Sequence, residues 1–141
     1  MAGDPVSHLP HGISFRFVDR VLQIVPGDRV VALKNVTVND PYLQDHFPGN
    51  PLMPGVLLVE SMAQTAGLLL PEGSSAVLAQ IKEARFRSPV IPGDQIRIEA
   101  VRRGGLGALH RFEVVALVNG VPAAEAEIVL AVVMPNAENQ P

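Results

Sequence analysis

No cysteine occurs in the 141 residues of this chain. This absence excludes disulfide cross-links, thiol nucleophiles and cysteine-ligated zinc sites, and it is compatible with a reducing cytoplasm. Charge is also scarce, because charged residues make up 18% of the sequence and hydrophobic residues 48%. Such a composition leaves more apolar surface than a small monomer usually exposes, and it therefore predicts an oligomer.

The N-terminus lacks a basic segment followed by an apolar run, so we expect no signal peptide. No apolar segment is long and uninterrupted enough to predict a membrane span. The net charge of −3 gives no signal for nucleic-acid binding. The length fits a single domain over residues 1–141. Within it we expect an irregular arm at residues 1–12 and a flexible tail at residues 135–141.

The charge is unevenly distributed along the chain. Between Lys82 and Arg111, seven basic residues stand against three acidic ones, which gives a local charge of +4. Such a segment suits an acidic partner, and an ordinary solvated face is the alternative.

The stretch that organises the chain is DHFPGNPLMPGVLLVESMAQTAGLLL, residues 45–70. Its first part holds His46 among three prolines and two glycines, which restrict the backbone to one shape. Pro54 suits the first turn of a helix, which we expect over residues 54–70. The amides of Gly55 and Val56 would then be unpaired donors at the positive end of the helix dipole.

Apolar side chains surround this expected helix on nearly every side, which predicts that it is buried. Glu60 lies in its middle, and a carboxylate removed from water has to be protonated, hydrogen-bonded or paired. Gln64 follows four residues later on the same helix face, where it can supply a hydrogen bond. The plainer alternatives are a structural role for His46, a satisfied core carboxylate for Glu60 and simple packing for Gln64.

The rest of the chain is typical of strands separated by turns. Pro26-Gly27-Asp28 and Asn119-Gly120 are hairpin signals. Two strands, one long buried helix and then four strands in a meander predict an α+β fold, with the helix across the concave face of a curled antiparallel sheet. The expected strands cover residues 20–25, 29–38, 75–82, 95–103, 109–118 and 121–134.

The residues from His46 to Gln64, HFPGNPLMPGVLLVESMAQ, resemble the signature of the 3-hydroxyacyl-[acyl-carrier-protein] dehydratases of bacterial fatty-acid synthesis, which have the hot-dog fold. The resemblance covers nearly the whole chain, through LPH at 9–11, VDRVL at 18–22, PGDRVVALKNVTVN at 26–39 and ARFRSPVIPGDQI at 84–96. It implies sheets that each wrap one helix and pair edge to edge in a homodimer, with trimers of dimers in many members. It implies no cofactor, and His8, His11 and His110 lack metal-ligand spacing.

By this resemblance, His46 from one subunit and Glu60 from the other are the catalytic pair, and the Gly55 amide is the oxyanion donor. The implied reaction converts a (3R)-hydroxyacyl thioester to the trans-2-enoyl thioester. His46 is the natural general base near neutral pH. A buried Glu60 would remain protonated enough to assist the leaving hydroxyl group.

The family's substrate is linked to an acyl carrier protein, which is acidic. The candidates for docking this carrier are Lys82, Arg85, Arg87, Arg102 and Arg103. The candidates for binding the substrate, besides Gly55, are Val56, Gln64, Phe47, Met53, Phe86 and Ile91. Ordinary core packing is the alternative for the large apolar members of that set.

The sequence departs from the family at Gly12, Ile13 and Ser14, a segment near the family's acyl entrance, and at Asp45, where glycine is usual. Two competing functions are a thioesterase on the same fold and a non-catalytic acyl-binding module.

Overall fold

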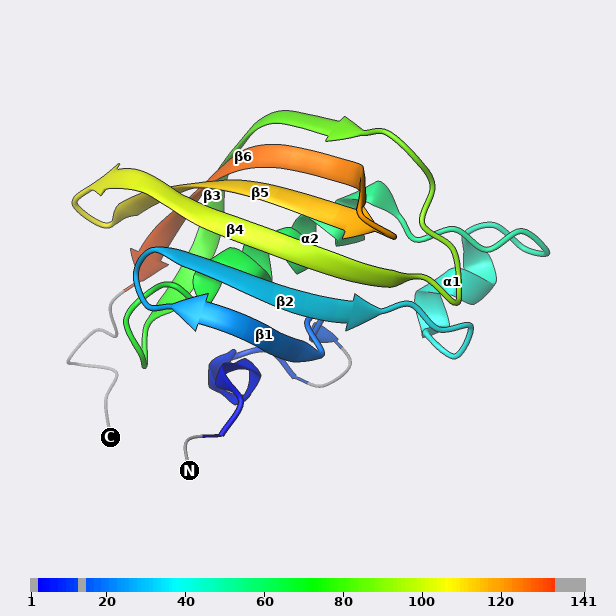
Figure 1. The fold of residues 1–141 in the computed structure, drawn as a ribbon, viewed down its shortest axis with the longest axis horizontal. Coiled ribbons are helices and arrows are strands. Elements are labelled where there is room, and N and C mark those ends of the chain that lie inside the picture. The colour runs from blue at the N-terminus through cyan, green and yellow to red at the C-terminus, as the bar shows by residue number, and fades with distance from the viewer. Residues whose placement is uncertain (1–2, 13–14, 134–141) are drawn as a thin grey trace.

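The computed structural model describes residues 3–12 and 15–133, apart from the side chains of Gln44 and Asp45. The expected tail, the departures at positions 13 and 14 and the side chain of Asp45 lie outside this part. The elements, in the order of Figure 1, are η1 (Pro5–His8), β1 (Arg20–Val25), β2 (Arg29–Asn35), α1 (Pro41–Asp45), α2 (Gly55–Gly67), β3 (Ser75–Phe86), β4 (Gln95–Leu106), β5 (Leu109–Val118) and β6 (Val121–Val133).

One antiparallel sheet holds all six described strands in the order β1-β2-β4-β5-β6-β3. The expected four-strand meander is wrong in one respect, because only β4, β5 and β6 are consecutive neighbours. After α2 the chain passes to the far edge of the sheet, where β3 pairs with β6 from Ser75↔Val133 to Phe86↔Ala124. The strand β3 is therefore an edge, and β2 pairs with β4 in its place.

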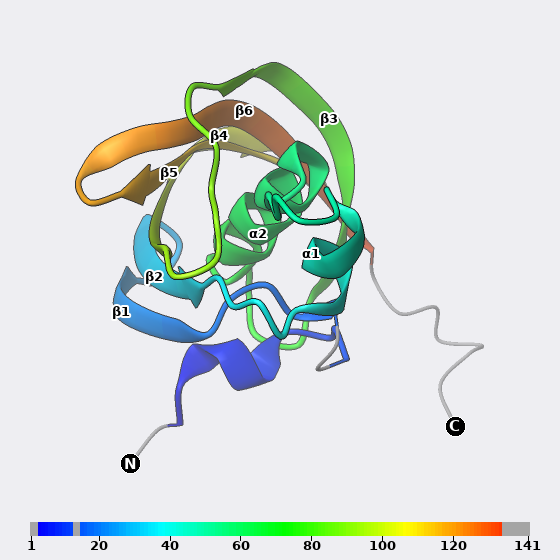
Figure 2. The ribbon, with the colours of Figure 1, turned by 90° about the vertical axis from the view of Figure 1, so that its right-hand side faces the viewer.

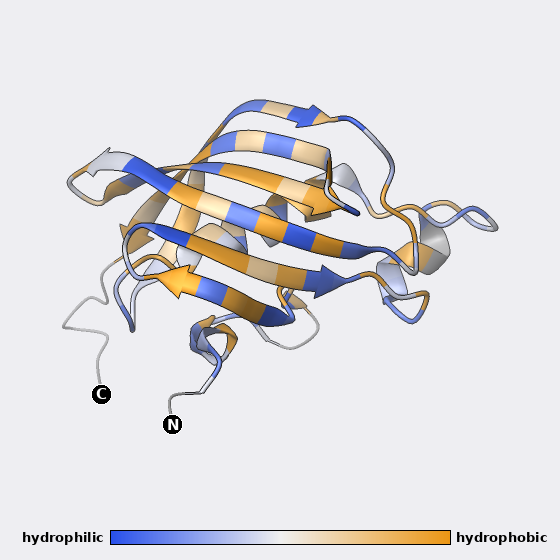
Figure 3. Cartoon of the chain, in the orientation of Figure 1, coloured by the Kyte–Doolittle hydropathy of each residue, from blue (hydrophilic) through white to orange (hydrophobic). Residues whose placement is uncertain are grey.

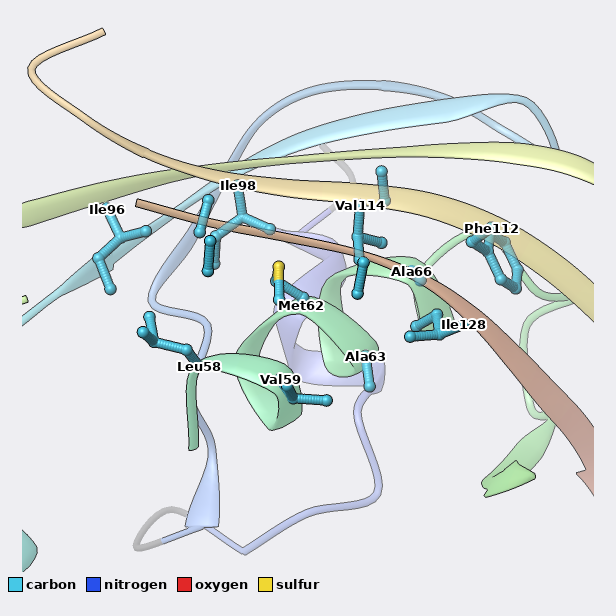
Figure 4. Close-up of a cluster of buried hydrophobic side chains, with 14 of the residues drawn as sticks. Leu58, Val59, Met62, Ala63, Ala66, Ile96, Ile98, Phe112, Val114 and Ile128 are labelled. Carbon is cyan, nitrogen blue, oxygen red and sulfur yellow. The ribbon is translucent and has the colours of Figure 1, made fainter. Parts of the chain in front are cut away.

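The sheet curls around α2, as Figure 2 shows. Strand residues alternate between hydrophilic and hydrophobic along β4 and its neighbours (Figure 3), so β2, β4, β5 and β6 turn one apolar face to the helix. The close-up in Figure 4 shows the resulting contact, in which Met62 and Ala66 of α2 lie against side chains of the sheet such as Ile98 and Phe112. The predicted α+β architecture with a central helix is confirmed.

Boundaries differ from the expectation in several elements, since β2 ends at Asn35 instead of residue 38 and β4 reaches Leu106 instead of residue 103. The structure ends α2 at Gly67, and backbone bonds among residues 65–70 form a looser turn after it. The expected strand at 75–82 is longer and reaches Phe86. The hairpin at Asn119-Gly120 is confirmed, since both residues have positive φ (52° and 78°) as a type I′ turn requires.

Within the described residues, no helix combines the length and the apolar character that crossing a membrane requires.

Candidate active site

His46 stands at the C-terminal end of the short helix α1 and is partly buried. The loop that follows folds back on it, because the amide of Leu52 donates to the carbonyl of His46 at 2.7 Å. The carbonyl of Leu52 in turn lies 2.8 Å from Nδ1 of the imidazole. A backbone carbonyl can only accept, so Nδ1 carries the proton and Nε2 keeps its lone pair. This loop therefore orients a histidine whose Nε2 can act as a base.

The start of α2 offers backbone donors. The first helical bonds run from the amides of Leu57 and Leu58 to the carbonyl of Pro54, and no side chain caps the helix start. The amides of Gly55 and Val56 therefore precede the first intrahelical bond, where the helix dipole is positive. A Cβ atom at Gly55 would lie 3.0 Å from the ring of Phe86. Glycine thus lets the ring of Phe86 approach this end of the helix closely.

Glu60 lies on α2 with 24% of its side chain exposed. The side-chain amide of Gln64 donates to Oε1 of Glu60 at 2.9 Å, as the spacing of four residues predicted. The orientation of this amide follows from its other partners, because Oε1 of Gln64 accepts from the amide of Phe17 and Nε2 donates to the carbonyl of Phe15. The sequence therefore identified the hydrogen-bond donor of Glu60 correctly.

A cleft of about 620 Å³ opens beside Glu60 and runs along the C-terminal half of α2. Glu60 and Gln64 lie at its wall with the arm residue His11, and Arg102 and His110 line it as well. Burial and the neighbouring Arg102 guanidinium lower the pKa of His110, whose Nδ1 accepts from Nε of Arg102 at 3.2 Å. The volume is in the range of small-molecule sites. His46 is not among the lining residues in the described chain.

The predicted lining residues fall into two groups. Phe47, Val56, Phe86 and Ile91 are all exposed in the single chain, with Val56 at 75% and Phe86 at 52%. Phe47 stacks on the imidazole of His46, with 4.3 Å between the ring centroids. Met53 is buried in the main core instead, with 2% of its surface exposed, so packing accounts for its position.

The five basic residues proposed for docking do not form one patch. Arg85 and Arg87 flank Phe86 and so lie near the start of α2, and Lys82 is on the same edge strand. Arg102 and Arg103 are at the β4–β5 hairpin, near the opposite end of the sheet. Glutamates from β5 and β6 also offset the local charge, since Arg87 pairs with Glu125 and Arg103 with Glu113.

Sequence reasoning missed one residue of the site. His11 was considered only as a metal ligand, yet its Nε2 lies 3.4 Å from Oε1 of Glu60. The one available signal was its position in Leu9-Pro10-His11, a flank that resembles the family. No group of three or more histidine, aspartate or glutamate side chains suited to a metal ion occurs in the part of the chain that the structure describes.

Comparison with known proteins shows the family to which the chain belongs. A family model described as a FabA-like domain matches residues 9–127. The chain is 45% identical over 127 residues to a protein of Geobacter metallireducens named 3-hydroxyacyl-[acyl-carrier-protein] dehydratase FabZ, covering 85% of both chains. A protein of the same name from Polynucleobacter asymbioticus is 48% identical over 129 residues, covering 88% of this chain and 87% of the relative.

Solved structures share the fold at lower identity. The dehydratase heterocomplex ApeI:P from Xenorhabdus doucetiae matches with a TM-score of 0.80 and 17% identity, over 98% of this chain and 95% of that one. Cj0977 from Campylobacter jejuni matches with a TM-score of 0.75 and 14% identity, over 96% and 92% of the two chains. The expected hot-dog fold is confirmed. The chain therefore belongs to the FabA-like family, among relatives named 3-hydroxyacyl-[acyl-carrier-protein] dehydratase.

Proposed function

We propose that this protein is a hydro-lyase that converts (3R)-hydroxyacyl-[acyl-carrier-protein] to trans-2-enoyl-[acyl-carrier-protein] and water in fatty-acid biosynthesis. The observation that carries the proposal is the bond between Nδ1 of His46 and the carbonyl of Leu52, at 2.8 Å. It fixes the imidazole as a base at Nε2, and its partner Leu52 lies three residues before the helix start at Gly55, where the amides are free. The cysteine-free composition is compatible with a cytoplasmic location.

Each part of the site has a role in this elimination. Nε2 of His46 takes a proton from C2, and the electron pair moves towards the thioester carbonyl. The developing enolate oxygen accepts from the amide of Gly55, and one such donor stabilises the transition state by roughly 3–4 kcal/mol. The C3–O bond then breaks while Glu60 gives its proton to the departing oxygen, which leaves as water. The protonated His46 returns the proton to Glu60 through solvent, so no cofactor is consumed.

The complete site requires two copies of the chain. In one protomer the cleft beside Glu60 is lined by described residues that do not include His46. The edge strand β3 has almost no buried residue, and Val77, Leu78 and Ile81 on it are exposed. An unpaired apolar edge of this kind favours pairing with another strand. We infer that two β3 strands pair, so that His46 of one protomer faces Glu60 of the other.

As the docking surface for the acyl carrier protein we favour the C-terminal end of β3, which lies near the start of α2. Lys82, Arg85 and Arg87 are exposed there, close to the helix start that holds the thioester. Replacing Lys82 and Arg85 with glutamate is expected to raise KM for a carrier-linked substrate by roughly ten-fold through charge reversal, and to leave a small thioester unaffected. The matched control is Arg103→Glu at the opposite end. Equal losses with both substrates would exclude docking as the role of this surface.

The direct test is hydration of a crotonoyl thioester, followed by loss of enoyl absorbance. The wild-type protein is expected to hydrate the double bond without releasing free thiol, whereas His46→Ala is expected to lose at least 100-fold of the rate as a missing general base. Thiol release would instead indicate a thioesterase. Tight binding without turnover would indicate an acyl-binding module, and either result would overturn the proposal.

A further inference from the structure

The segment that precedes β1 packs on the middle of α2 through its described residues 15–17, and His11 of the same segment is a second histidine at Glu60. The hydroxyl of Ser61 donates to the carbonyl of Phe17 at 2.6 Å, and Gln64 bonds the backbone of Phe15 and Phe17. These bonds come from consecutive turns of the helix, so the segment has a fixed position on it. His11 is thereby held with Nε2 at 3.4 Å from Oε1 of Glu60.

The ring of His11 is also held from its own side. It stacks on the ring of Phe15, with 6.3 Å between centroids and 22° between planes. The guanidinium of Arg16 donates to the backbone carbonyl of His11 at 3.3 Å. The stacking restricts the orientation of the imidazole, the bond from Arg16 fixes the backbone of His11, and neither contact occupies the Nε2 atom. The nitrogen that faces Glu60 is therefore kept for that carboxyl group.

The surroundings of Nδ1 indicate which ring nitrogen carries the proton. Nδ1 of His11 is buried and has no hydrogen-bond partner among the described residues. A proton there would be a buried donor without an acceptor, which is more costly than a bare acceptor. The environment thus favours the tautomer with its proton on Nε2, which faces a carboxyl oxygen.

Both neighbours of Glu60 act on the same oxygen. Gln64 donates to Oε1 at 2.9 Å, and His11 lies against Oε1 as well. Within the part of the chain that the structure describes, no hydrogen bond reaches Oε2. Two contacts on one oxygen restrict rotation about the last side-chain bond, and they leave Oε2 of Glu60, a residue of the cleft wall, without a partner among the described residues.

We propose that His11 is a positioning residue for Glu60, which holds the carboxyl group through Oε1 so that Oε2 delivers the proton to the departing hydroxyl group. The inference rests on the proposed function and extends it to a residue outside the expected catalytic pair. The other charged or titratable side chains around this part of the cleft are His8, Glu72, Arg16, Arg102 and His110. His8 faces Glu72 at 3.5 Å, Arg102 faces His110, and Arg16 donates to the backbone carbonyl of His11. None of these five is paired with Glu60 among the contacts of the described residues.

The test compares two substitutions of His11, by glutamine and by asparagine, whose side-chain amides lie at different distances from the backbone. In His11→Gln the amide nitrogen can occupy the place of Nε2, whereas in His11→Asn it lies near the place of Nδ1. For hydration of a crotonoyl thioester, His11→Asn is expected to lower kcat roughly 10- to 100-fold through misplacement of the acid, with KM within about two-fold of wild type. His11→Gln is expected to recover kcat to within a few-fold. The control is Ser7→Asn in the same arm, at an exposed residue outside the cleft lining, which is expected to behave as wild type.

The outcomes separate this inference from the function on which it rests. An inactive wild-type protein would overturn the proposed function and this inference with it. An active wild type with normal kcat in His11→Asn would overturn the role of His11 alone. Equal losses in His11→Asn and His11→Gln would also overturn it, since the donor at Nε2 would then be irrelevant. Thermal unfolding of both variants near the wild-type midpoint is the expected accompanying result.

Discussion

At the scale of single residues, the two catalytic candidates are constrained in the same way. His46 is held through Nδ1 by the carbonyl of Leu52, and Glu60 is held through Oε1 by Gln64. Each side chain thus has one polar atom bonded to the protein and a second one free for the substrate. Such pre-organisation reduces the cost of aligning the acid and the base in the transition state.

Replacing Glu60 with glutamine tests the acid directly. The carboxamide keeps an oxygen for the bond from Gln64, but its nitrogen cannot release a proton at neutral pH. We expect kcat for hydration to fall by about 10²- to 10⁴-fold, the contribution typical of a general acid, with KM and the thermal midpoint almost unchanged. Turnover within about three-fold of wild type would remove Glu60 from the mechanism.

A residue of the site could be predicted from the sequence when the residues that it contacts are close to it along the chain. Gln64 was found because helix geometry places it one turn from Glu60. His46 and Gly55 could be proposed from the sequence because proline and glycine mark the loop and helix start around them, and their catalytic roles stay predictions. His11 was missed, since its contact with Glu60 arises only when the arm packs on α2, and no local pattern encodes that packing.

At the scale of elements, the sequence located the helix and the hairpins but misplaced β3. Hairpins carry their own turn signals, as at Asn119-Gly120. The pairing of β3 with β6 joins Ser75 to Val133, which are far apart in the chain and share no turn. Exposed apolar residues such as Val77 and Ile81 then resemble those of a central strand. Position within the sheet is therefore a tertiary property that strand patterns do not contain.

The β4–β5 hairpin carries a testable dependence of stability on pH. Burial and Arg102 lower the pKa of His110 in the folded protein, while in the unfolded chain it is about 6.5. As the pH falls below about 6.5, the unfolded state takes up a proton that the folded state resists, so the free energy of unfolding decreases until the folded pKa is passed. At pH 7.5 the imidazole of His110 is neutral in both states, so this decrease in the free energy of unfolding has not begun.

Replacing His110 with glutamine should remove that component. The measurement is the free energy of unfolding by denaturant at pH 7.5 and at pH 5.5 for both proteins. We expect the decrease between the two pH values to be smaller in the variant than in the wild type. Identical decreases would show that His110 does not contribute to the pH dependence.

At the scale of the whole molecule, charge in the sequence and charge on the surface differ. The segment from Lys82 to Arg111 carries a net +4, yet four of the glutamates on the outer face pair with its arginines, at Arg87–Glu125, Arg97–Glu99, Arg103–Glu113 and Arg111–Glu127. Three of these glutamates, Glu113, Glu125 and Glu127, follow the segment in the sequence and belong to β5 and β6, so the count within the segment does not include them. A basic run in the sequence is therefore not evidence for a basic surface once the sheet forms.

The proposed division of the site between two protomers makes a prediction about the assembly. If His46 of one chain serves Glu60 of the other, then each site needs one intact residue from each chain. His46→Ala and Glu60→Gln should each be nearly inactive alone. In a mixed dimer of the two variants, one site lacks both groups and the other site has both.

Co-expression of the two variants in equal amounts measures this directly. Random assembly makes about half of the dimers mixed, and each mixed dimer has one intact site of two, so about one quarter of wild-type activity should return. The control is co-expression of His46→Ala with a chain that carries both substitutions, which offers no intact site and should stay inactive. Recovery no greater than in this control would show that His46 and Glu60 act within one chain, and pairing along β3 would then have to serve stability rather than catalysis.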